Sequence, residues 1–439
     1  MNATEREARA LDRIDLASIV ADTCDLIRGR GENPGGTEAE TVARLASICR
    51  RIGAEVRLQE IAPGRANLRA SVGPEDGPAV LFLGHSDVVP AGEGWSGDPF
   101  APRVSDDTII GRGSTDMKGG LACVLAAMHA VSSVAPELRL ELLCTVDEED
   151  RALGVRAALA ADSLADAAPA DAAPREYLAC IVAEPTDLDV VVGCRGASNF
   201  IIDVVGASAH AGRPEDGASS IFAAARIVEL IRDRHARAAA GPRDPLLGGP
   251  TWNVGTISGG SGTSMVPRVT TLTVDRRTMP GESAEAILSD LLAGAASDIA
   301  ASGIANADRI ELSGAIDMTM PGFRTDGSAP VARLASEALR DLGQPGRQTG
   351  WTAACEGGFI AEHHGTPTII LGPGDITGQA HQPDERVSIP HLDLAARAYA
   401  LTVLRLADAL RAPDAGPDPD SDSETIRTHS PTSAWRGTP

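Results

Sequence analysis

The chain has 439 residues, which is too long for one ordinary hydrophobic core and predicts two domains. Hydrophobic residues make up 43% of it but aromatic residues only 3%, so aliphatic side chains must fill the interiors. The net charge of −22 would repel phosphate backbones, which argues against a nucleic-acid partner.

Other compositional features predict a cytoplasmic protein that does not enter a membrane. No apolar run approaches the roughly 20 residues needed to cross a bilayer. Segment 1–16 is charged and predicts a helix, without the apolar stretch of a signal peptide. The seven cysteines are scattered and form no CxxC pair, so we expect them to be buried small hydrophobic side chains.

The first half of the chain predicts helices that alternate with strands buried on both faces. Thr37 and Glu40 have the spacing of a capping box, and the apolar stripe behind them predicts a helix that Gly53 ends. A segment rich in Ala and Leu predicts a second helix at 117–134. Short apolar runs predict the strands, at 79–84, 138–146 and 178–183. This alternation predicts an α/β sheet with helices on both sides.

The middle of the chain predicts a smaller α+β domain inserted into the first one. Strands are expected at 200–205, 252–258 and 269–276, and helices at 221–234 and 284–299. A strand at 367–371 and a helix at 391–410 then resume the α/β pattern. We therefore assign 1–195 and 317–411 to the larger domain and 196–316 to the inserted one. Two segments of skewed composition are expected on the surface: an insertion at 161–174 and a disordered tail at 412–439.

Histidines and carboxylates that suit a metal site follow the ends of the predicted strands. Open α/β sheets bind ligands at the carboxyl ends of their strands. Each group has an ordinary explanation by itself, since a single His is most often a hydrogen-bonded surface residue and an acidic run is most often a solvated loop. Five segments carry these groups: His85 and Asp87 in GHSDVVP, Asp116 in GRGSTDMKGG, Asp147, Glu148 and Glu149 in TVDEED, Glu184 in AEPT, and His381 in GQAHQPDE.

Together these segments favour two metal ions over isolated surface groups. Two histidines and several carboxylates supply the nitrogen and oxygen ligands that zinc accepts. The adjacent Glu148 and Glu149 would repel each other unless a cation lay between them. Because one carboxylate can bridge two metals, five side chains are enough to hold a pair about 3.5–4 Å apart.

The five segments, in this order, resemble the M20 family of metallopeptidases and deacylases, and the resemblance runs from about Asp22 to Leu410. It implies a zinc-exopeptidase-like catalytic domain with a central mixed sheet, and an inserted α+β lid and dimerisation domain. It also implies a role for each site residue. His85 and Glu184 bind one metal, Glu149 and His381 bind the other, Asp116 bridges them, Glu148 is the general base, and Asp87 orients His85.

The inserted domain also resembles the family's lid, which implies a homodimer with a shared active site. SAHAGRPEDGASS matches the family's histidine motif, so His210 is expected to reach the neighbouring subunit's active site. Simpler roles stay open, since His210 could cap a turn, and Asn253 and Arg277 could tie strands together. Four residues are candidates for substrate binding: Arg195 in GCRG, Asn253 in NVGTISGG, Arg277 in VDRRTMPG and Gly357 in CEGGFIAE.

The stretches CEGGFIAE and LGPGDITGQAHQPDE resemble acetylornithine deacetylases more than other members of the family. We therefore expect a metal-dependent amidohydrolase that cleaves the amide bond of a small N-acyl amino acid or dipeptide. Its cofactors would be two divalent ions, with zinc expected and cobalt or manganese as alternatives. M20 dipeptidases, carboxypeptidases and aminoacylases remain alternatives. The intact ligand set and Glu148 argue against a non-catalytic binding homologue, and the acidic chain without a phosphate-binding loop argues against a phosphoesterase.

Overall fold

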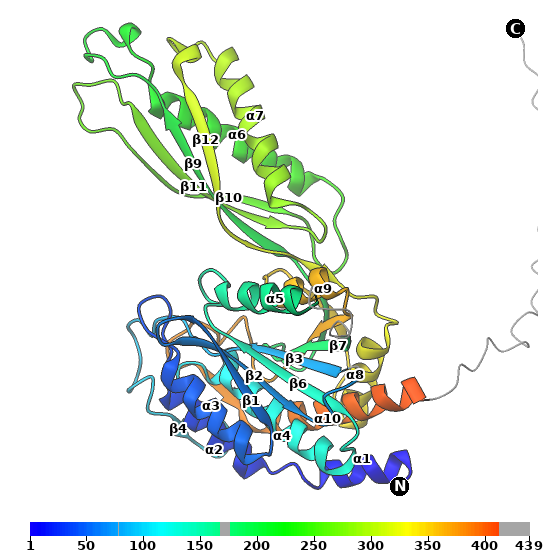
Figure 1. The fold of residues 1–439 in the computed structure, drawn as a ribbon. Helices are drawn as coiled ribbons and strands as arrows, with labels where there is room; N and C mark the ends of the chain where they lie inside the picture. The colour runs from blue at the N-terminus through cyan, green and yellow to red at the C-terminus, as the bar shows by residue number, and fades with distance from the viewer. Residues whose placement is uncertain (78, 167–175, 412–439) are drawn as a thin grey trace, which may run out of the picture.

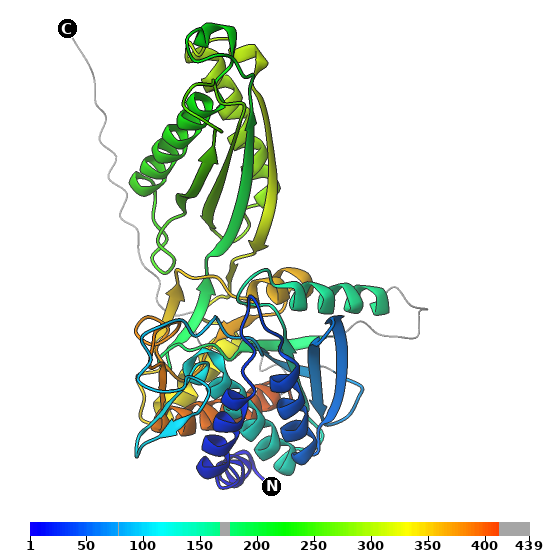
Figure 2. The ribbon, with the colours of Figure 1, turned by 90° about the vertical axis from the view of Figure 1, so that its left-hand side faces the viewer.

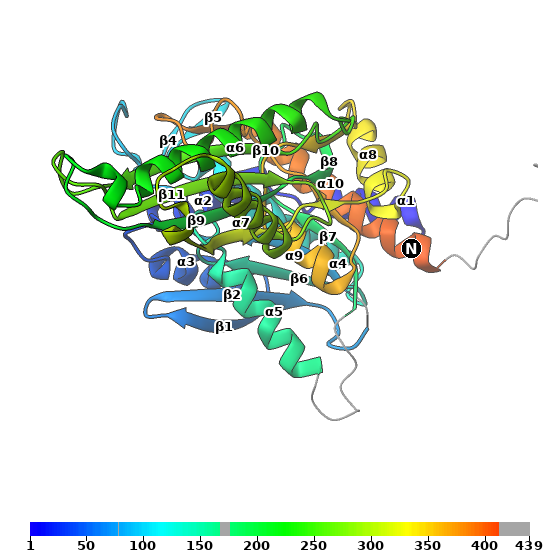
Figure 3. The same cartoon turned by 90° about the horizontal axis from the view of Figure 1, so that it is seen from above.

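Apolar strands buried on both faces form the centre of the larger domain, as the sequence predicts. The computed structural model describes residues 1–77, 79–166 and 176–411 (Figure 1). Nine strands form one mixed sheet in the order β1-β2-β6-β3-β7-β15-β8-β13, with β14 paired to β8, and β1 and β2 lie at one outer edge (Figure 3). The strands are β1 (Glu55–Ala62), β2 (Arg65–Val72), β3 (Ala79–His85), β6 (Arg139–Thr145), β7 (Tyr177–Val182), β8 (Val190–Cys194), β13 (Phe323–Arg324), β14 (Gln348–Trp351) and β15 (Thr368–Ile370).

Helices cover both faces of this sheet, and each face has its own apolar cluster. One face is covered by α1 (Ala3–Leu11), α2 (Leu16–Arg28), α3 (Ala39–Arg51), α4 (Gly119–Val134), α8 (Pro330–Asp341) and α10 (Ile389–Arg411). The other face carries α5 (Leu153–Asp166) and α9 (Gly357–His364), which lie between the sheet and the smaller domain in Figure 1. A separate small sheet joins β4 (Arg103–Val104), β5 (Thr108–Ile110) and β16 (Arg386–Ser388).

The segment Ser114–Val134 is, among the described helices, the one long and apolar enough to cross a membrane by composition. It joins a π-helical turn, Ser114–Lys118, to α4. In its most apolar window, 72% of the residues are buried inside the protein, and α4 packs against α2 and α10. Burial in the core accounts for this composition.

The smaller domain is a four-stranded antiparallel sheet with two helices packed on it (Figure 2). Its strand order is β10-β11-β9-β12, and β12 continues beyond residue 316. Two short 3-10 helices complete it, η2 (Pro214–Asp216) and η3 (Ala307–Arg309). The main elements are β9 (Gly196–Val205), α6 (Ser220–Ala240), β10 (Thr251–Gly259), β11 (Val269–Thr278), α7 (Ala284–Ala301) and β12 (Glu311–Met320).

Two strand-to-strand connections join the domains, from β8 into β9 and from β12 into β13. Two glycines meet where these connections pass each other. A Cβ atom added to Gly196 would lie 2.7 Å from the backbone nitrogen of Gly322, and one added to Gly322 would lie 2.7 Å from that of Gly196. Glycine therefore lets the two backbones approach more closely than residues with side chains would permit.

The predicted capping box at the start of α3 is wrong. The helix begins at Ala39 with Glu38 at the N-cap position and no side-chain cap, and Thr37 Oγ1 accepts only a 3.4 Å hydrogen bond from the Ala39 amide. Glu38 is buried and ion-paired with Arg65, so this contact fixes the start of the helix one residue later. At the other end, Gly53 follows the helix with φ +83°, as predicted.

Two further expectations, for the N-terminal segment and for the expected surface insertion, also need correction. The helix expected over 1–16 spans only Ala3–Leu11, and Leu16 already begins α2, which Asp15 caps by accepting a hydrogen bond from the Ala17 amide. Residues 161–166 complete α5 instead of forming an insertion, since α5 packs into the apolar cluster beneath it. The rest of that expected insertion and the expected tail at 412–439 lie outside the described residues. All seven cysteines are buried and free, as predicted.

Replacing Gly120 by Ala is expected to lower the free energy of unfolding by about 1–3 kcal/mol. The added Cβ would lie 2.1 Å from the Ala183 carbonyl oxygen, so α4 would have to move away from the end of β7. Gly294→Ala in α7 is the matched control, because the nearest atom there belongs to the flexible Arg234 side chain. The control is expected to be neutral or to stabilise by up to about 1 kcal/mol, since Ala is the better helix former. Urea unfolding measures both, and equal stability of the two variants would contradict the prediction.

Candidate active site

The predicted metal ligands meet at the carboxyl edge of the central strands. His85 is the last residue of β3, Glu149 follows β6, and Glu184 follows β7. Because β3 pairs in parallel with both neighbours, these three strand ends lie at the same edge of the sheet. Asp116 comes from the turn that precedes α4, and His381 comes from the loop between β15 and β16.

Asp116 lies between two histidine–glutamate pairs. Its Oδ1 is 3.2 Å from His85 Nε2, and its Oδ2 is 3.3 Å from His381 Nε2. His85 Nε2 also lies 3.3 Å from Glu184 Oε1, and His381 Nε2 lies 3.2 Å from Glu149 Oε2. The two pairs are the same ones that the resemblance assigns to separate metals, with Asp116 in the bridging place.

The three carboxylates in this cluster repel one another, and bound cations would offset that repulsion. The side chains of Asp116, Glu149 and Glu184 are only 7–8% exposed. Burial raises the pKa of Glu184 to about 7 and also raises the pKa of Glu149, and the charge of Asp116 raises both further. Among the described residues, the buried Glu149 Oε1 has no hydrogen-bond partner. An unpartnered oxygen beside nitrogen and oxygen ligands within 4.8 Å of one another is what a divalent ion would satisfy.

Asp87 contacts both His85 and the turn that carries the two glutamates. Its Oδ1 lies 3.4 Å from His85 Nδ1, on the side of the ring away from Asp116. Its two oxygens also accept hydrogen bonds from the backbone amides of Glu148 and Glu149, at 3.2 and 3.1 Å. The position therefore suits the predicted orienting role, and it also fixes the turn on which Glu148 stands.

Glu148 stands next to Glu149 at the side of the cluster, and the residue as a whole is partly exposed. Its carboxyl group nevertheless lies among buried charged groups. Burial raises the pKa of Glu148 well above its usual range; the positive charge of His85 opposes this shift, and the negative charges of Glu184 and Glu149 add to it. A carboxyl group whose pKa is raised in this way holds a proton more readily than an exposed one, as a general base requires.

His210 is not part of this cluster within one chain. It lies on an exposed turn beyond the end of β9, bridged to Met265, and its Nδ1 accepts a 3.0 Å hydrogen bond from the Gly212 amide. β9 leaves the larger domain at Gly196 and runs for 10 residues, or about 30 Å. The strand runs away from the larger domain (Figure 2). His210 follows its outer end, so it lies at the far end of the smaller domain from the predicted metal ligands of its own chain.

The substrate-binding candidates lie around the domain junction. Arg195 donates hydrogen bonds to the carbonyl oxygens of Gly249 and Thr352, at 2.8 and 2.9 Å. Arg277 lies at the junction end of β11 and forms an ion pair with Asp275 at 3.2 Å. Asp275 in turn lies opposite the exposed Asn253 on the neighbouring strand β10. In the described part of the chain, no hydrogen bond or ion pair joins these three candidates to the predicted metal ligands.

Gly357 begins α9 in a tightly packed position. A Cβ atom added there would lie 2.7 Å from Val182 Cγ2 on β7. The glycine therefore lets α9 approach β7 closely, which is a packing role. Its predicted role in substrate binding stays a prediction.

Three buried polar residues around the cluster were not predicted as site residues. Asn33 Nδ2 donates to Asp87 Oδ2 at 2.8 Å, and its segment carries no recognisable signal. Glu356 accepts a hydrogen bond from Thr145, and burial raises its pKa to about 8. Glu385 accepts a hydrogen bond from the Asp116 amide at 3.1 Å. Its place in the segment GQAHQPDE, four residues after a predicted ligand, is the signal that could have found it.

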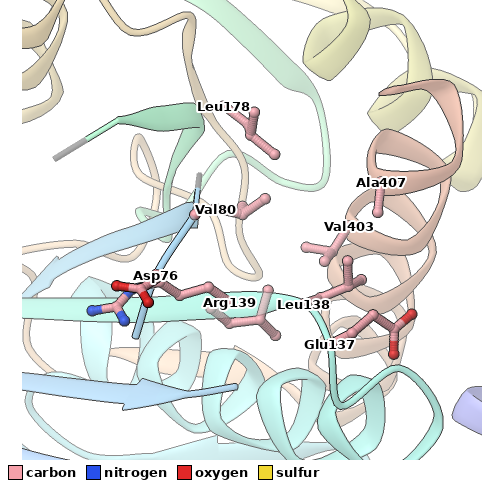
Figure 4. Close-up of a pocket in the computed structure, with 10 residues that line it drawn as sticks. Asp76, Val80, Glu137, Leu138, Arg139, Leu178, Val403 and Ala407 are labelled. Carbon is pink, nitrogen blue, oxygen red and sulfur yellow. The ribbon is translucent and has the colours of Figure 1, made fainter. Parts of the chain in front are cut away.

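A cavity of about 190 Å³ lies at the opposite edge of the same sheet (Figure 4). Its lining includes Val80, Leu138 and Leu178, at the starts of β3, β6 and β7, together with Val403 from α10. None of the predicted site residues lines it. The predicted site residues therefore lie at the carboxyl ends of the strands, away from this cavity.

Comparisons with known proteins identify the family of this chain. Residues 81–405 match the family described as peptidase family M20/M25/M40. The chain is 30% identical over 369 residues to an acetylornithine deacetylase from Aliivibrio fischeri, covering 81% of this chain and 88% of that protein. The fold is similar to a dipeptidase from Saccharomyces cerevisiae, with TM-score 0.70, 14% identity, and coverage of 92% and 98%. It is also similar to a dinuclear metal binding peptidase of the M20 family from Bacillus subtilis, with TM-score 0.64, 17% identity, and coverage of 89% and 97%.

The family match begins inside β3 and ends inside α10, so it includes the whole smaller domain and every segment of the cluster. The fold similarity extends over nine-tenths of the chain. The predicted family, the mixed α/β fold and the metal-dependent hydrolase class are confirmed together. This chain belongs to the M20 peptidase family of metal-dependent hydrolases.

Proposed function

We propose that this protein is a two-zinc N-deacylase that cleaves the amide bond of a small N-acyl amino acid, with acetylornithine as the model substrate. The observation that carries the proposal is Asp116, whose two oxygens each face a separate histidine–glutamate pair. Similarity to proteins named acetylornithine deacetylase, over 81% of the chain, supports the substrate class. Imidazole and carboxylate ligands support zinc as the native ion.

In this proposal, His85 and Glu184 hold one ion, Glu149 and His381 hold the other, and Asp116 holds both. The two ions would lower the pKa of a water molecule and polarise the substrate carbonyl. Glu148 accepts a proton from the water as its oxygen bonds to the carbonyl carbon. The same carboxyl then gives the proton to the amide nitrogen as the carbon–nitrogen bond breaks, which releases a carboxylate and a free amine.

Arginines at the domain junction are proposed to bind the carboxylate of the substrate. Burial lowers the pKa of Arg195, and the positive charges of Arg277 and Arg243 lower it further, so each of these two guanidinium groups acts on Arg195. Asp275 offsets part of that charge. An anion placed among the three would relieve the remaining repulsion, and guanidinium groups bind carboxylates with two parallel hydrogen bonds.

We also propose that the active site is completed by dimerisation. His210 of one chain lies far from that chain's own metal ligands, on an exposed turn. A second chain could bring His210 of the partner subunit to the reacting carbonyl, where its imidazole would donate a hydrogen bond to the developing oxyanion.

Glu148→Gln is expected to lower kcat by about 10²–10⁴-fold while two zinc ions remain bound. Glutamine keeps the shape of the side chain but cannot accept the proton of the attacking water. Asp150→Asn is the control, because Asp150 is an exposed neighbour whose ion pair, with Arg151, is a loose 3.7 Å. Steady-state kinetics and elemental analysis measure the two effects. Near-normal turnover in Glu148→Gln would exclude it as the base.

Removal of the metal with a chelator is expected to abolish hydrolysis, and two equivalents of zinc or cobalt should restore it. The proposal also predicts that N-acetylornithine is hydrolysed with higher kcat/KM than N-succinyl amino acids or dipeptides. A panel of these substrates, assayed with the reloaded protein, measures both expectations. Activity in a sample that elemental analysis finds free of metal would contradict the two-metal site, whereas a preference for dipeptides would contradict only the deacylase assignment.

Subunit exchange between two inactive variants tests the shared site. His210→Ala and Glu148→Gln homodimers should each be nearly inactive, since losing an oxyanion donor costs about 10²–10³ in rate. A mixed dimer would contain one site that combines an intact Glu148 with His210 of the partner subunit. Activity per dimer should therefore return toward half of the wild-type value. If mass spectrometry confirms exchange and no activity returns, the shared site is wrong.

A further inference from the structure

We propose that Glu385 is a positioning residue that fixes the bridging Asp116 relative to His381, and so sets how tightly one of the two metal positions binds its ion. The inference rests on the proposed two-metal function. Glu385 is not one of the predicted metal ligands, and its side chain is fully buried. Glu385 is the last residue of the loop that carries His381, and its carboxylate contacts the turn that carries Asp116.

All the acceptor positions of the Glu385 carboxylate are used by the turn before α4. Oε1 accepts hydrogen bonds from the backbone amides of Thr115 and Asp116, at 2.8 and 3.1 Å. Oε2 accepts hydrogen bonds from the amide of Gly113 and from Arg112 Nη1, at 3.1 and 2.7 Å. A carboxylate offers about four acceptor sites, so this one is saturated by a single short segment. Asp116 is therefore held through its own backbone by another residue's charge.

Arg112 adds a second contact between the Asp116 turn and the His381 loop. It is 2% exposed, and besides Glu385 its Nη1 also donates to the carbonyl oxygen of Gln382 at 3.3 Å, the residue after His381. Its guanidinium carbon lies 5.1 Å from the centre of the Trp95 ring, which holds the side chain in place. The buried pair of Arg112 and Glu385 thus ties the Asp116 turn to the His381 loop.

The two proposed metal positions depend to different degrees on the contacts between Arg112 and Glu385. His85 is 1% exposed and ends a central strand, and Glu184 directly follows the neighbouring strand. His381 is 50% exposed, has φ +64°, and comes from a loop. Since the sheet already fixes the position formed by His85 and Glu184, loss of the Glu385 contacts should weaken mainly the position that His381 shares with Glu149.

The test is a calorimetric titration of the metal-free full-length protein with zinc. In Glu385→Gln, one side-chain oxygen becomes an NH₂ donor that faces backbone N–H donors, so the turn can no longer be held from both sides. One of the two binding steps should weaken by about 10–100-fold, as is typical for groups that hold metal ligands, and the other should be unchanged. The weakened step should be the one that disappears in His381→Ala. Arg112→Lys, which keeps a positive charge but loses the guanidinium group that contacts both Glu385 and the Gln382 carbonyl, should give a smaller effect of the same kind.

Glu141→Gln is the matched control, because Glu141 is an equally buried carboxylate that pairs with Arg69 and Arg139 on the sheet, outside the two loops. It should lower the melting temperature without changing either zinc step. Two unchanged steps in Glu385→Gln, or equal weakening of both, would overturn the inference, and if that variant does not fold, Arg112→Lys decides in the same way. Fewer than two zinc ions in the wild-type protein would instead contradict the proposed function.

Discussion

Carboxylates that lie close together in a buried site repel one another, and much of the larger domain holds three of them in place against that repulsion. Asp116, Glu149 and Glu184 come from three separate segments, so nothing in the local chain keeps them together. The parallel pairing of β3 with its neighbours brings the strand ends to one edge. Backbone hydrogen bonds to Asp87 and Glu385 then fix the two turns. Cations at this edge would convert the repulsion into binding energy, which explains why a fold would maintain it.

The sequence predicted the ligand cluster and the strands β3, β6, β7 and β15 because both have local signals. Ligand residues directly follow apolar runs, and those runs need no other part of the chain to be recognised. β1 was missed because it is an edge strand in which no residue is fully buried, so it has no apolar run. The supporting contacts were missed for another reason. Glu385 and Arg112 are 273 residues apart in the chain, and Asn33 and Asp87 are 54 apart, so only the fold brings them together.

The site combines opposite local charges within a strongly acidic protein. A net charge of −22 would repel a substrate that carries a carboxylate. Fields of exposed charges, however, fade beyond about 8–10 Å at physiological salt, so nearby groups dominate. The guanidinium groups of Arg195, Arg243 and Arg277 therefore matter more to an approaching anion than the distant acidic surface does. They lie where the two domains meet, which is where we propose that the carboxylate of a substrate binds.

Because of the glycine pair at the junction, the position of the smaller domain's outer end depends strongly on the angle between the two domains. Gly196 and Gly322 pass so closely that the two connections approach a single pivot, and β9 extends about 30 Å from it. A rotation of about 10° there would move the outer end by about 5 Å, roughly the pitch of one helical turn. The position of His210 is thus far more sensitive to the joint angle than the positions of Arg195 and Arg277, which lie near the pivot. Bulkier residues at the pivot would change the reach of the outer end before they changed the chemistry at the metals.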